Sequence, residues 1–217
     1  MTKIPVYFMP GLAASSLIFE RILLPDSFEK ILLEWEIPLG NESLKDYAKR
    51  ISLKIDKKNP VLVGVSFGGI LVQEISKYID VRKVIIISSV KSNLEFPLRM
   101  KIAKTTKAYK LIPTKLILNI ENLAKFSFGD KVNQKLRLYE KFLSVRDKNY
   151  LDWAIEQVVL WDRVIVDSKV IHIHGDMDDV FPIKYIKDCI VVKGGTHIMI
   201  LNKFKWLNEN LPKLILT

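Results

Sequence analysis

The chain has 217 residues, a length that fits one domain, or one domain with an insertion, and that can bury a core without disulfides or a bound metal. Hydrophobic residues make up 49% of the sequence and charged residues 27%, which excludes a disordered chain, and the single cysteine excludes a disulfide framework or a cysteine-rich metal centre. The formal net charge of +10 raises the question of an anionic partner, although a lysine-rich solvated surface is the simpler explanation.

The cysteine count and the hydropathy indicate where the protein acts. A single cysteine suits a reducing compartment, so we expect a cytoplasmic location. No apolar run approaches the ~20 residues of a membrane-spanning helix, so stable membrane insertion is not expected. The apolar stretch 8–17, which follows Lys3, imitates a secretory signal. Because Pro10 and Gly11 interrupt this stretch, we assign it to a strand and a loop.

The first part of the chain alternates between expected strands and expected helices. Short apolar runs predict strands at 4–8, 30–35, 61–64 and 83–88. Apolar residues at helical spacing predict helices at 15–24, 41–55 and 67–79, with Asn41 as the N-cap of the second. The run at 83–88 is almost continuously apolar, as in a strand that is buried on both faces.

The pattern changes after residue 90. Segment 91–163 has helical periodicity and no convincing strand, and strand patterns resume at 169–174 and 189–193 before a final helix at 198–210. This alternation predicts an α/β fold with a mostly parallel sheet flanked by helices. We therefore expect a core formed by residues 1–90 and 164–217, with residues 91–163 inserted as an all-helical cap.

The turn between the strand at 61–64 and the helix at 67–79 carries the motif G-x-S-x-G, as Gly64-Val65-Ser66-Phe67-Gly68. A nucleophile on a sharp strand-to-helix turn requires neighbours without a Cβ, because the chain turns tightly and packs closely there. The helix start that follows offers backbone N–H groups and a positive dipole end to a developing oxyanion. Ser66 is therefore the candidate nucleophile, and an inert serine at a glycine-rich helix start is the alternative.

A serine nucleophile needs a base, and the base needs an orienting acid. His197 follows the last expected strand in a loop from which an imidazole can reach the sheet edge, so it is the candidate base. His172 and His174 lie two residues apart on one strand and therefore point to one face. We expect His174 to pack or pin a loop and His172 to be a satisfied interior residue. The acid is expected in the loop after that strand, which holds Asp176, Asp178 and Asp179.

The chain order of Ser66, an aspartate and His197, with the serine on a strand-to-helix turn, resembles the α/β-hydrolase fold family. The resemblance covers the whole chain, except that the usual leading antiparallel strands are missing, and it implies a small esterase-like serine hydrolase with a helical cap. Relatives often carry G-x-x-D-x-x-x-P in the acid loop, with that aspartate as the triad acid. Aligned on the glycine and proline at 175 and 182, the motif implies Asp178. Asp176 would then cap or pin the loop, and Glu95, after the strand at 83–88, is a remoter alternative for the acid.

The same resemblance implies where an oxyanion would bind. Many relatives have His-Gly where Pro10-Gly11 stands in this sequence, followed by a residue whose backbone N–H forms part of the oxyanion hole. By that resemblance, the backbone N–H groups of Leu12 and Phe67 would form the hole. The absent histidine leaves the hole intact because backbone amides bind the oxyanion. No metal and no organic cofactor are implied.

Segment 99–115 is basic and contains no acidic residue. Its cations are Arg99, Lys101, Lys104, Lys107, Lys110 and Lys115. We interpret them as the solvated side of a helix whose apolar side packs on the body, the alternative being attraction of an anionic substrate or an acidic membrane surface. That apolar side would consist of Ile102, Ala103, Leu111 and Ile112. Two later apolar stretches, 116–118 and 153–161, would either line an acyl pocket between cap and sheet or belong to the core.

These residues together predict a serine hydrolase that cleaves a carboxylic ester or thioester of a small molecule through an acyl-enzyme. The alternatives on the same fold are C–C bond hydrolysis, acyl transfer, lyase chemistry and cofactor-free peroxidation. An alternative of another class is a small-molecule-binding protein with little or no turnover.

Two further kinds of site are not expected. The run 172–176 matches the start of the metallo-β-lactamase signature H-x-H-x-D-H, but Met177 stands where the next histidine should be, so a metal site is not expected. No nucleic-acid-binding motif accompanies the positive net charge, so a nucleic-acid partner is not expected either. Cys189 begins an apolar run, and we expect it in the core.

Overall fold

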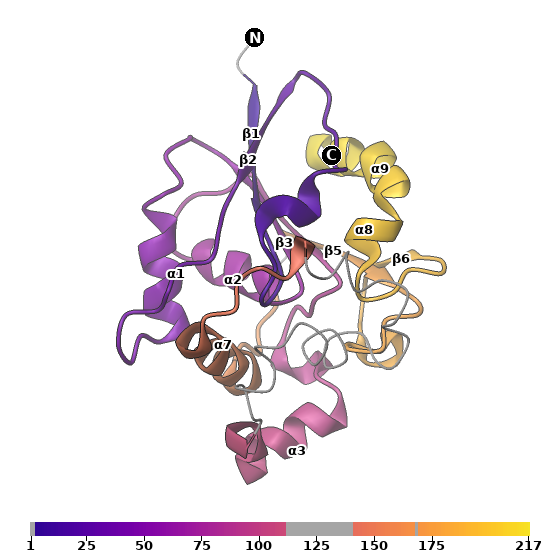
Figure 1. Cartoon of the computed structure of the whole chain (residues 1–217). Helices are drawn as coiled ribbons and strands as arrows, with labels where there is room; N and C mark the ends of the chain where they lie inside the picture. The colour runs from indigo at the N-terminus through magenta and orange to yellow at the C-terminus, as the bar shows by residue number, and fades with distance from the viewer. Residues whose placement is uncertain (1–2, 112–140, 168) are drawn as a thin grey trace.

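A six-stranded sheet runs through the centre of the molecule in the order β2-β1-β3-β4-β5-β6 (Figure 1). The structure is a computed structural model that describes residues 3–111, 141–167 and 169–217. The strands are β1 (Ile4–Met9), β2 (Phe28–Leu32), β3 (Val61–Val65), β4 (Lys83–Ile87), β5 (Val170–Gly175) and β6 (Ile190–Val192). Every neighbouring pair in this sheet is parallel, which confirms the predicted fold class.

The two strands at the centre of the sheet are almost entirely buried. β3 is buried along its whole length and β4 everywhere except at Lys83, and both consist mainly of valine, isoleucine and leucine, as expected for strands that are covered on both faces. Met9 pairs with Gly64, and Val65 pairs with Ile87. The carboxyl ends of β1, β3 and β4 therefore lie level, and the loops that follow them leave the sheet at one edge.

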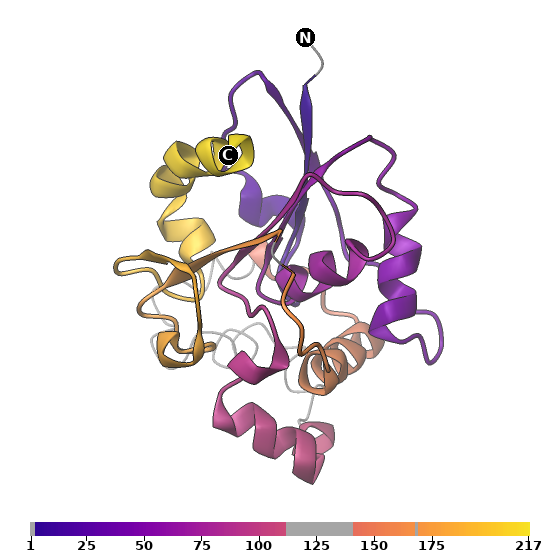
Figure 2. The same ribbon diagram turned by 180° about the vertical axis from the view of Figure 1, so that it is seen from behind.

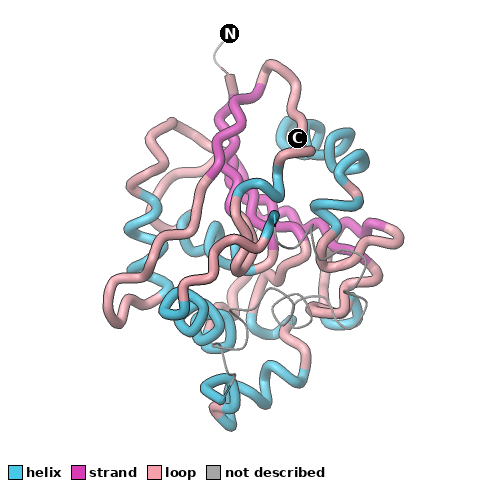
Figure 3. Tube along the Cα trace, viewed as in Figure 1, coloured by secondary structure: helices cyan, strands magenta, loops and turns pink. Residues whose placement is uncertain are grey.

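Helices cover both faces of the sheet (Figures 1 and 2). On one face α1 (Leu44–Ser52) packs against α2 (Phe67–Ile75), and α2 lies against β1, β3 and β4. On the other face lie the short 3-10 helix η1 (Ser16–Phe19), α8 (Met199–Asn202) and α9 (Phe204–Leu216), with α8 in contact with η1. The trace in Figure 3 shows the same sheet between two layers of helix.

A group of helices follows β4 and lies beyond the carboxyl ends of the strands (Figure 1). These helices are η2 (Asn93–Glu95), α3 (Leu98–Thr106), η3 (Ala108–Leu111) and α7 (Lys148–Leu160), and a further short helix, η5 (Ile183–Tyr185), lies between β5 and β6. The described part of segment 91–163 is helical, as predicted, whereas the stretch 116–118 lies outside the described residues. The division into a core and a cap at these boundaries stays a prediction.

Several helix boundaries differ from the sequence-based expectation. The helix expected at 15–24 is reduced to η1, because the chain turns after Phe19 and the Lys30 ammonium donates hydrogen bonds to the carbonyls of Phe19 and Ile22. Asn41 is not the N-cap of α1: it lies in a turn in which Glu42 N–H donates to Leu39 O, and Ser43 is the cap.

Three other predicted elements also end at residues that differ from the expectation. The helix predicted at 198–210 is two helices, α8 and α9, separated at Lys203, and α9 continues to Leu216. The helix predicted at 67–79 ends at Ile75, and the strand predicted at 30–35 is β2, which ends at Leu32.

The predicted packing of α3 is wrong. No residue of α3 is buried, and the side chains of Ile102 and Leu111 are 52% and 82% exposed, while Ile112 lies outside the described residues. Two exposed lysines of this helix donate to carbonyls outside it: Lys101 to Leu94 O, and Lys104 to Leu160 O at the end of α7. These lysines act as donors to backbone carbonyls as well as solvated charges.

Two smaller expectations concern the membrane and the cysteine. No helix in the described ranges has the length and apolar character that crossing a bilayer requires. Cys189 lies just before β6 and is half-buried, whereas the sequence predicted that it lies in the core.

Candidate active site

Ser66 lies on the turn between β3 and α2, at the carboxyl end of the central strand. Its backbone has φ 52° and ψ −119°, a positive φ that a non-glycine residue rarely adopts and that a sharp strand-to-helix turn imposes. Its N–H donates to Ile87 O at 3.0 Å, and its carbonyl accepts from Ser89 Oγ at 2.7 Å. The strained turn is thus held by β4 and by the residues that follow β4.

The glycines of the motif are required by close backbone contacts. A Cβ on Gly64 would lie 2.3 Å from Gly68 O, and a Cβ on Gly68 would lie 2.3 Å from Pro10 O. A Cβ on Gly69 would lie 2.5 Å from Ser89 Oγ. The start of α2 therefore packs directly against the end of β1, which brings the loop after β1 next to the serine.

His197 and Asp178 complete a chain of hydrogen bonds with Ser66. Ser66 Oγ is 2.9 Å from His197 Nε2, and His197 Nδ1 is 2.9 Å from Asp178 Oδ2. An ionised carboxylate only accepts hydrogen bonds, so Nδ1 carries the imidazole proton and Nε2 is free to accept the proton of Ser66 Oγ. The structure brings together Ser66 and His197, which the sequence pattern indicated, and Asp178, which the family resemblance implied, in the arrangement that activation of a serine requires.

The loops that carry Asp178 and His197 are packed against each other. A Cβ on Gly175 would lie 2.2 Å from Gly195 O, and Met177 N–H donates to that same carbonyl at 2.9 Å. Asp176 accepts a hydrogen bond from Gly194 N–H at 2.6 Å. Asp176 therefore pins the two loops together, as expected, and does not contact His197.

Asp178 is buried and strongly hydrogen-bonded. Its Oδ1 accepts the backbone N–H groups of Val180 and Phe181, each at 2.9 Å. Burial raises the pKa of Asp178, but the charge and hydrogen bond of His197 and the N–H of Phe181 outweigh burial, and its pKa lies below the ordinary value. The carboxyl group is therefore ionised at neutral pH. Glu95, the remoter alternative, instead accepts the backbone N–H groups of Lys91 and Lys187.

The two predicted oxyanion donors lie beside Ser66. A Cβ on Gly11 would lie 3.4 Å from Ser66 Cβ, which places the Gly11–Leu12 peptide next to the serine side chain. Among the described residues, neither the N–H of Leu12 nor that of Phe67 donates to a protein acceptor. Both amides are therefore available to an oxygen atom bound near Ser66 Oγ.

An aromatic cluster supports this side of the site, and nothing in the sequence pattern pointed to it. The rings of Trp35 and Phe67 are stacked at 4.8 Å, and Trp35 also contacts the ring of Tyr150 at 5.3 Å. Trp153 of α7 meets the edge of Phe67 at 5.9 Å. No local motif links these four residues, because they come from the segment after β2, from α2 and from α7.

The two remaining histidines form a buried pair behind Asp178. His174 Nε2 is 2.8 Å from Phe181 O, so His174 pins the acid loop as expected, and its Nδ1 is 3.0 Å from His172 Nε2. Because a carbonyl only accepts, His174 Nε2 carries its proton, and His172 Nε2 donates to His174 Nδ1. Burial lowers the pKa of both histidines, most strongly that of His172, so the pair is neutral at pH 7.

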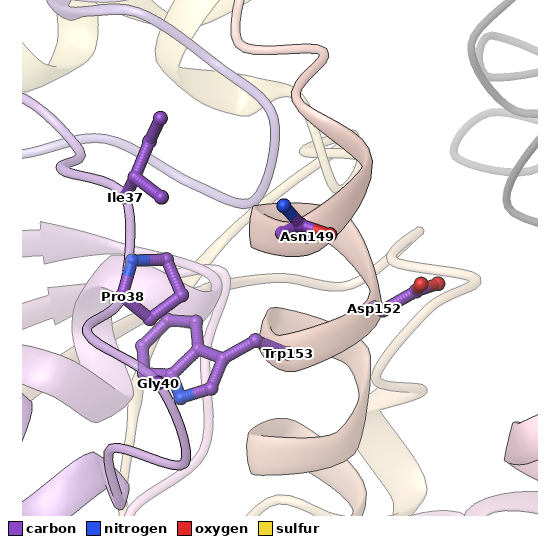
Figure 4. A pocket seen from close by; sticks show the side chains of 6 residues that line it. All are labelled: Ile37, Pro38, Gly40, Asn149, Asp152 and Trp153. Atoms are coloured by element: carbon purple, nitrogen blue, oxygen red, sulfur yellow. The ribbon is translucent and has the colours of Figure 1, made fainter.

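A hollow of about 320 Å³ lies between the segment after β2 and α7 (Figure 4). It is lined by Ile37, Pro38, Gly40, Asn149, Asp152 and Trp153. Of the stretch 153–161, which was predicted to line an acyl pocket or to belong to the core, Trp153 lines this hollow. Trp161, at the other end of the stretch, is buried, and its Nε1–H donates to the Glu74 carboxylate. Trp153 therefore lines the hollow and also contacts the edge of the Phe67 ring. In the described ranges no group of three or more histidine, cysteine, aspartate and glutamate side chains is arranged to hold a metal ion.

Solved structures with a similar fold cover nearly the whole chain. They include an esterase from Thermogutta terrifontis, with 15% sequence identity, a TM-score of 0.69 and coverage of 98% of this chain and 91% of that one. A carboxylesterase from Nitrososphaera gargenis has 16% identity and a TM-score of 0.72, with coverage of 99% and 90%. A bromoperoxidase from Bacillus anthracis has 18% identity and a TM-score of 0.68, with coverage of 100% and 93%.

The sequence by itself yields no such similarity, since a scan against models of protein families and a search of curated proteins found no match. The parallel sheet with helices on both faces is the feature that the solved structures share with this protein over more than nine-tenths of its length. The chain has the α/β-hydrolase fold.

Proposed function

We propose that this protein is a serine hydrolase that cleaves a carboxylic ester or thioester of a small molecule through an acyl-enzyme. The observation that carries the proposal is the continuous hydrogen-bond chain from Ser66 Oγ through His197 to Asp178, with 2.9 Å at each step. Structures of similar fold include esterases and carboxylesterases, which fits ester hydrolysis.

The acylation step follows from the proton positions in this chain. Ser66 Oγ attacks the substrate carbonyl carbon while its proton passes to His197 Nε2. Asp178 stabilises the imidazolium through Nδ1. The carbonyl oxygen becomes an oxyanion that accepts the N–H groups of Leu12 and Phe67, each worth roughly 3–4 kcal/mol in the transition state. When the intermediate collapses, the bond to the leaving alcohol or thiol breaks and His197 returns the proton to it.

Deacylation uses the same groups in reverse. A water molecule gives a proton to His197 Nε2 and attacks the acyl carbon, and the new oxyanion occupies the same two N–H groups. Collapse of this intermediate breaks the bond to Ser66 Oγ, which regains its proton from His197. The products are a carboxylic acid and the regenerated enzyme.

Reaction with a fluorophosphonate tests the proposal directly, because the reagent reacts preferentially with an activated serine. The pure protein should gain one adduct by intact mass, and peptide mapping should place that adduct on Ser66. Ser66→Ala and His197→Ala should both abolish it. Ser76→Ala is the matched control, since Ser76 ends the same helix and its hydroxyl donates to Gln73 O, away from the site.

The turnover number for ester or thioester hydrolysis then distinguishes an enzyme from a binding protein, because a binding protein would hydrolyse almost none of these compounds. Labelled protein should lose hydrolysis of p-nitrophenyl esters and acyl thioesters of graded chain length in proportion to the adduct. A folded protein that gains no adduct and turns over none of these compounds would contradict the proposal. The small-molecule-binding alternative would then take its place.

A further inference from the structure

One side chain of α3 reaches the loop that carries Asp178. Arg99 Nη2 donates to the carbonyls of Asp179 at 2.7 Å and Val180 at 2.8 Å. Nη2 carries two hydrogens, so it can serve both carbonyls at once. Arg99 precedes these residues by about 80 positions and belongs to the helical segment that follows β4.

The two peptide groups that accept from Arg99 face Asp178 with their opposite ends. The carbonyl of Asp179 and the N–H of Val180 belong to one peptide group, and the carbonyl of Val180 and the N–H of Phe181 belong to the next. Both N–H groups donate to Asp178 Oδ1 at 2.9 Å. Each peptide group therefore joins the guanidinium cation to the carboxylate anion.

Hydrogen bonds in series strengthen one another. A cation at the carbonyl end polarises a peptide group so that its N–H becomes a better donor, and an anion at the N–H end has the complementary effect. The two ends also fix the plane of each peptide group. The orientation of the Asp178 carboxylate, and through it that of the His197 ring, depends on these planes.

The neighbouring cations of α3 do not make this connection. Lys101 donates to Leu94 O, and Lys104 donates to the carbonyls of Leu160 and Trp161, so both stay within the helical segment between β4 and β5. Within the described part of α3, Arg99 is the basic residue that crosses to the acid loop.

We propose that Arg99 is a positioning residue for Asp178, acting through the two peptide groups 179–180 and 180–181. This proposal rests on the proposed function, since it assigns Arg99 a part in orienting the acid of that site. Arg99 touches neither the substrate nor the reacting atoms. Its contribution is to hold the carboxylate in the orientation that the imidazolium requires, and small displacements of such groups are costly.

Steady-state kinetics of three variants provide the first test. Arg99→Met removes the donor and keeps an unbranched side chain, and kcat should fall about 10- to 100-fold with KM within about twofold of wild type. Arg99→Lys keeps a cation with several donors and should recover most of the lost kcat. Lys101→Met removes a cation from the same helix and should leave both constants unchanged.

Hydrogen exchange provides a second test that does not depend on activity. In Arg99→Met the peptide that spans 176–182 should exchange at least about tenfold faster than in wild type, because the N–H groups of Val180 and Phe181 lose their support. Exchange elsewhere, and exchange throughout Lys101→Met, should match wild type.

The two tests separate failure of this proposal from failure of the proposed function. If wild type hydrolyses no ester and takes up no fluorophosphonate, the proposed function fails, and exchange alone then shows whether Arg99 holds the loop. If wild type is active but Arg99→Met matches Lys101→Met in kcat and in loop exchange, the role assigned to Arg99 is wrong. A loss confined to KM, or one that Arg99→Lys does not recover, would also overturn it.

Discussion

The indole of Trp35 lies flat on the phenyl ring of Phe67, with ring centroids 4.8 Å apart and ring planes 8° apart. The same indole donates its Nε1–H to Gly11 O at 2.8 Å. That carbonyl belongs to the peptide group whose N–H is that of Leu12. Trp35 therefore contacts Phe67 by stacking and the Gly11–Leu12 peptide group by a hydrogen bond to its carbonyl, and these two sites carry the N–H groups that we propose as the oxyanion hole.

Replacing Trp35 by phenylalanine should separate these two contacts. Trp35→Phe keeps an aromatic ring against Phe67 but removes the N–H, so the Gly11–Leu12 peptide loses a fixed partner. We expect kcat to fall about tenfold or more, because a misplaced oxyanion donor affects the transition state more than the bound substrate. Ester hydrolysis by the purified variant measures this.

Trp153→Phe is the matched control for that variant. Its indole belongs to the same aromatic cluster, but its Nε1 donates to Glu42 O and not to the loop after β1. Its kcat should stay close to wild type. Equal losses of kcat in both variants would mean that the cluster acts only through packing.

Asn substitutions distinguish Asp178 from Asp176, two of the three aspartates in the acid loop. Asp178→Asn places an amide N–H₂ or carbonyl opposite His197 Nδ1 and should lower kcat about 10⁴-fold, because the imidazole is no longer held in the required tautomer. Asp176→Asn keeps an oxygen that can accept Gly194 N–H and should stay within about tenfold of wild type. The reverse ranking of the two rates would identify Asp176 as the acid.

Glycine substitutions test the close approach of α2 to β1. Gly68→Ala would place a Cβ 2.3 Å from Pro10 O and 2.5 Å from Met9 O, which are backbone atoms that cannot move independently. We expect the free energy of unfolding to fall by about 3 kcal/mol or more, together with loss of fluorophosphonate labelling. Urea unfolding followed by tryptophan fluorescence measures the stability.

Gly40→Ala provides the comparison for this variant. Gly40 has φ +50°, and a Cβ at this position would have no atom within 4 Å, so the substitution costs only backbone strain of about 1 kcal/mol. Labelling of Ser66 should be unaffected. A Gly68→Ala variant as stable and as reactive as Gly40→Ala would contradict the packing described for the turn.

The buried histidine pair predicts how stability depends on pH. The pKa of His172 lies well below its ordinary value of 6.5, mainly because of burial, so the folded protein keeps it neutral while the unfolded chain protonates near pH 6.5. The unfolded state therefore binds more protons as the pH falls, and stability is lost below about pH 6.5. Asp178 does not contribute in this range, because its pKa is lowered and its carboxylate stays charged.

His172→Phe isolates this effect. The variant cannot protonate at this position, so its free energy of unfolding should fall by about 1 kcal/mol less than that of wild type between pH 7 and pH 5.5. Urea titrations at the two pH values give the difference. Parallel losses in the two proteins would show that His172 titrates alike in the folded and unfolded states.

Much of the fold and of the candidate site could be predicted because it depends on local pattern. The apolar run at 83–88 indicated a strand covered on both faces, and the glycines around Ser66 indicated a turn without room for a Cβ. The small number of histidines indicated His197, the resemblance to the α/β-hydrolase fold family implied Asp178, and the structure places the two within hydrogen-bond distance. Their roles in catalysis stay a prediction.

Other features could not be predicted because they depend on contacts between distant segments. Helical spacing in α3 indicated an apolar side but not what covers it, and the exposed Ile102 shows that spacing alone does not imply burial. Trp35 and Arg99 carried no motif. Their importance comes from contacts with peptide carbonyls, one at Gly11 and the others in the acid loop, which only the folded chain brings about.

The parallel sheet has a consequence for how the protein is made. Parallel neighbours such as β1 and β3, or β4 and β5, lie far apart along the chain, so contacts between them close long loops and form slowly. The groups around Ser66 come from residue 12 to residue 197, and a nascent chain lacks the last of them until residue 197 has been synthesised. Recovery of fluorophosphonate labelling after dilution from urea would therefore report completion of refolding, later than any probe of a single helix.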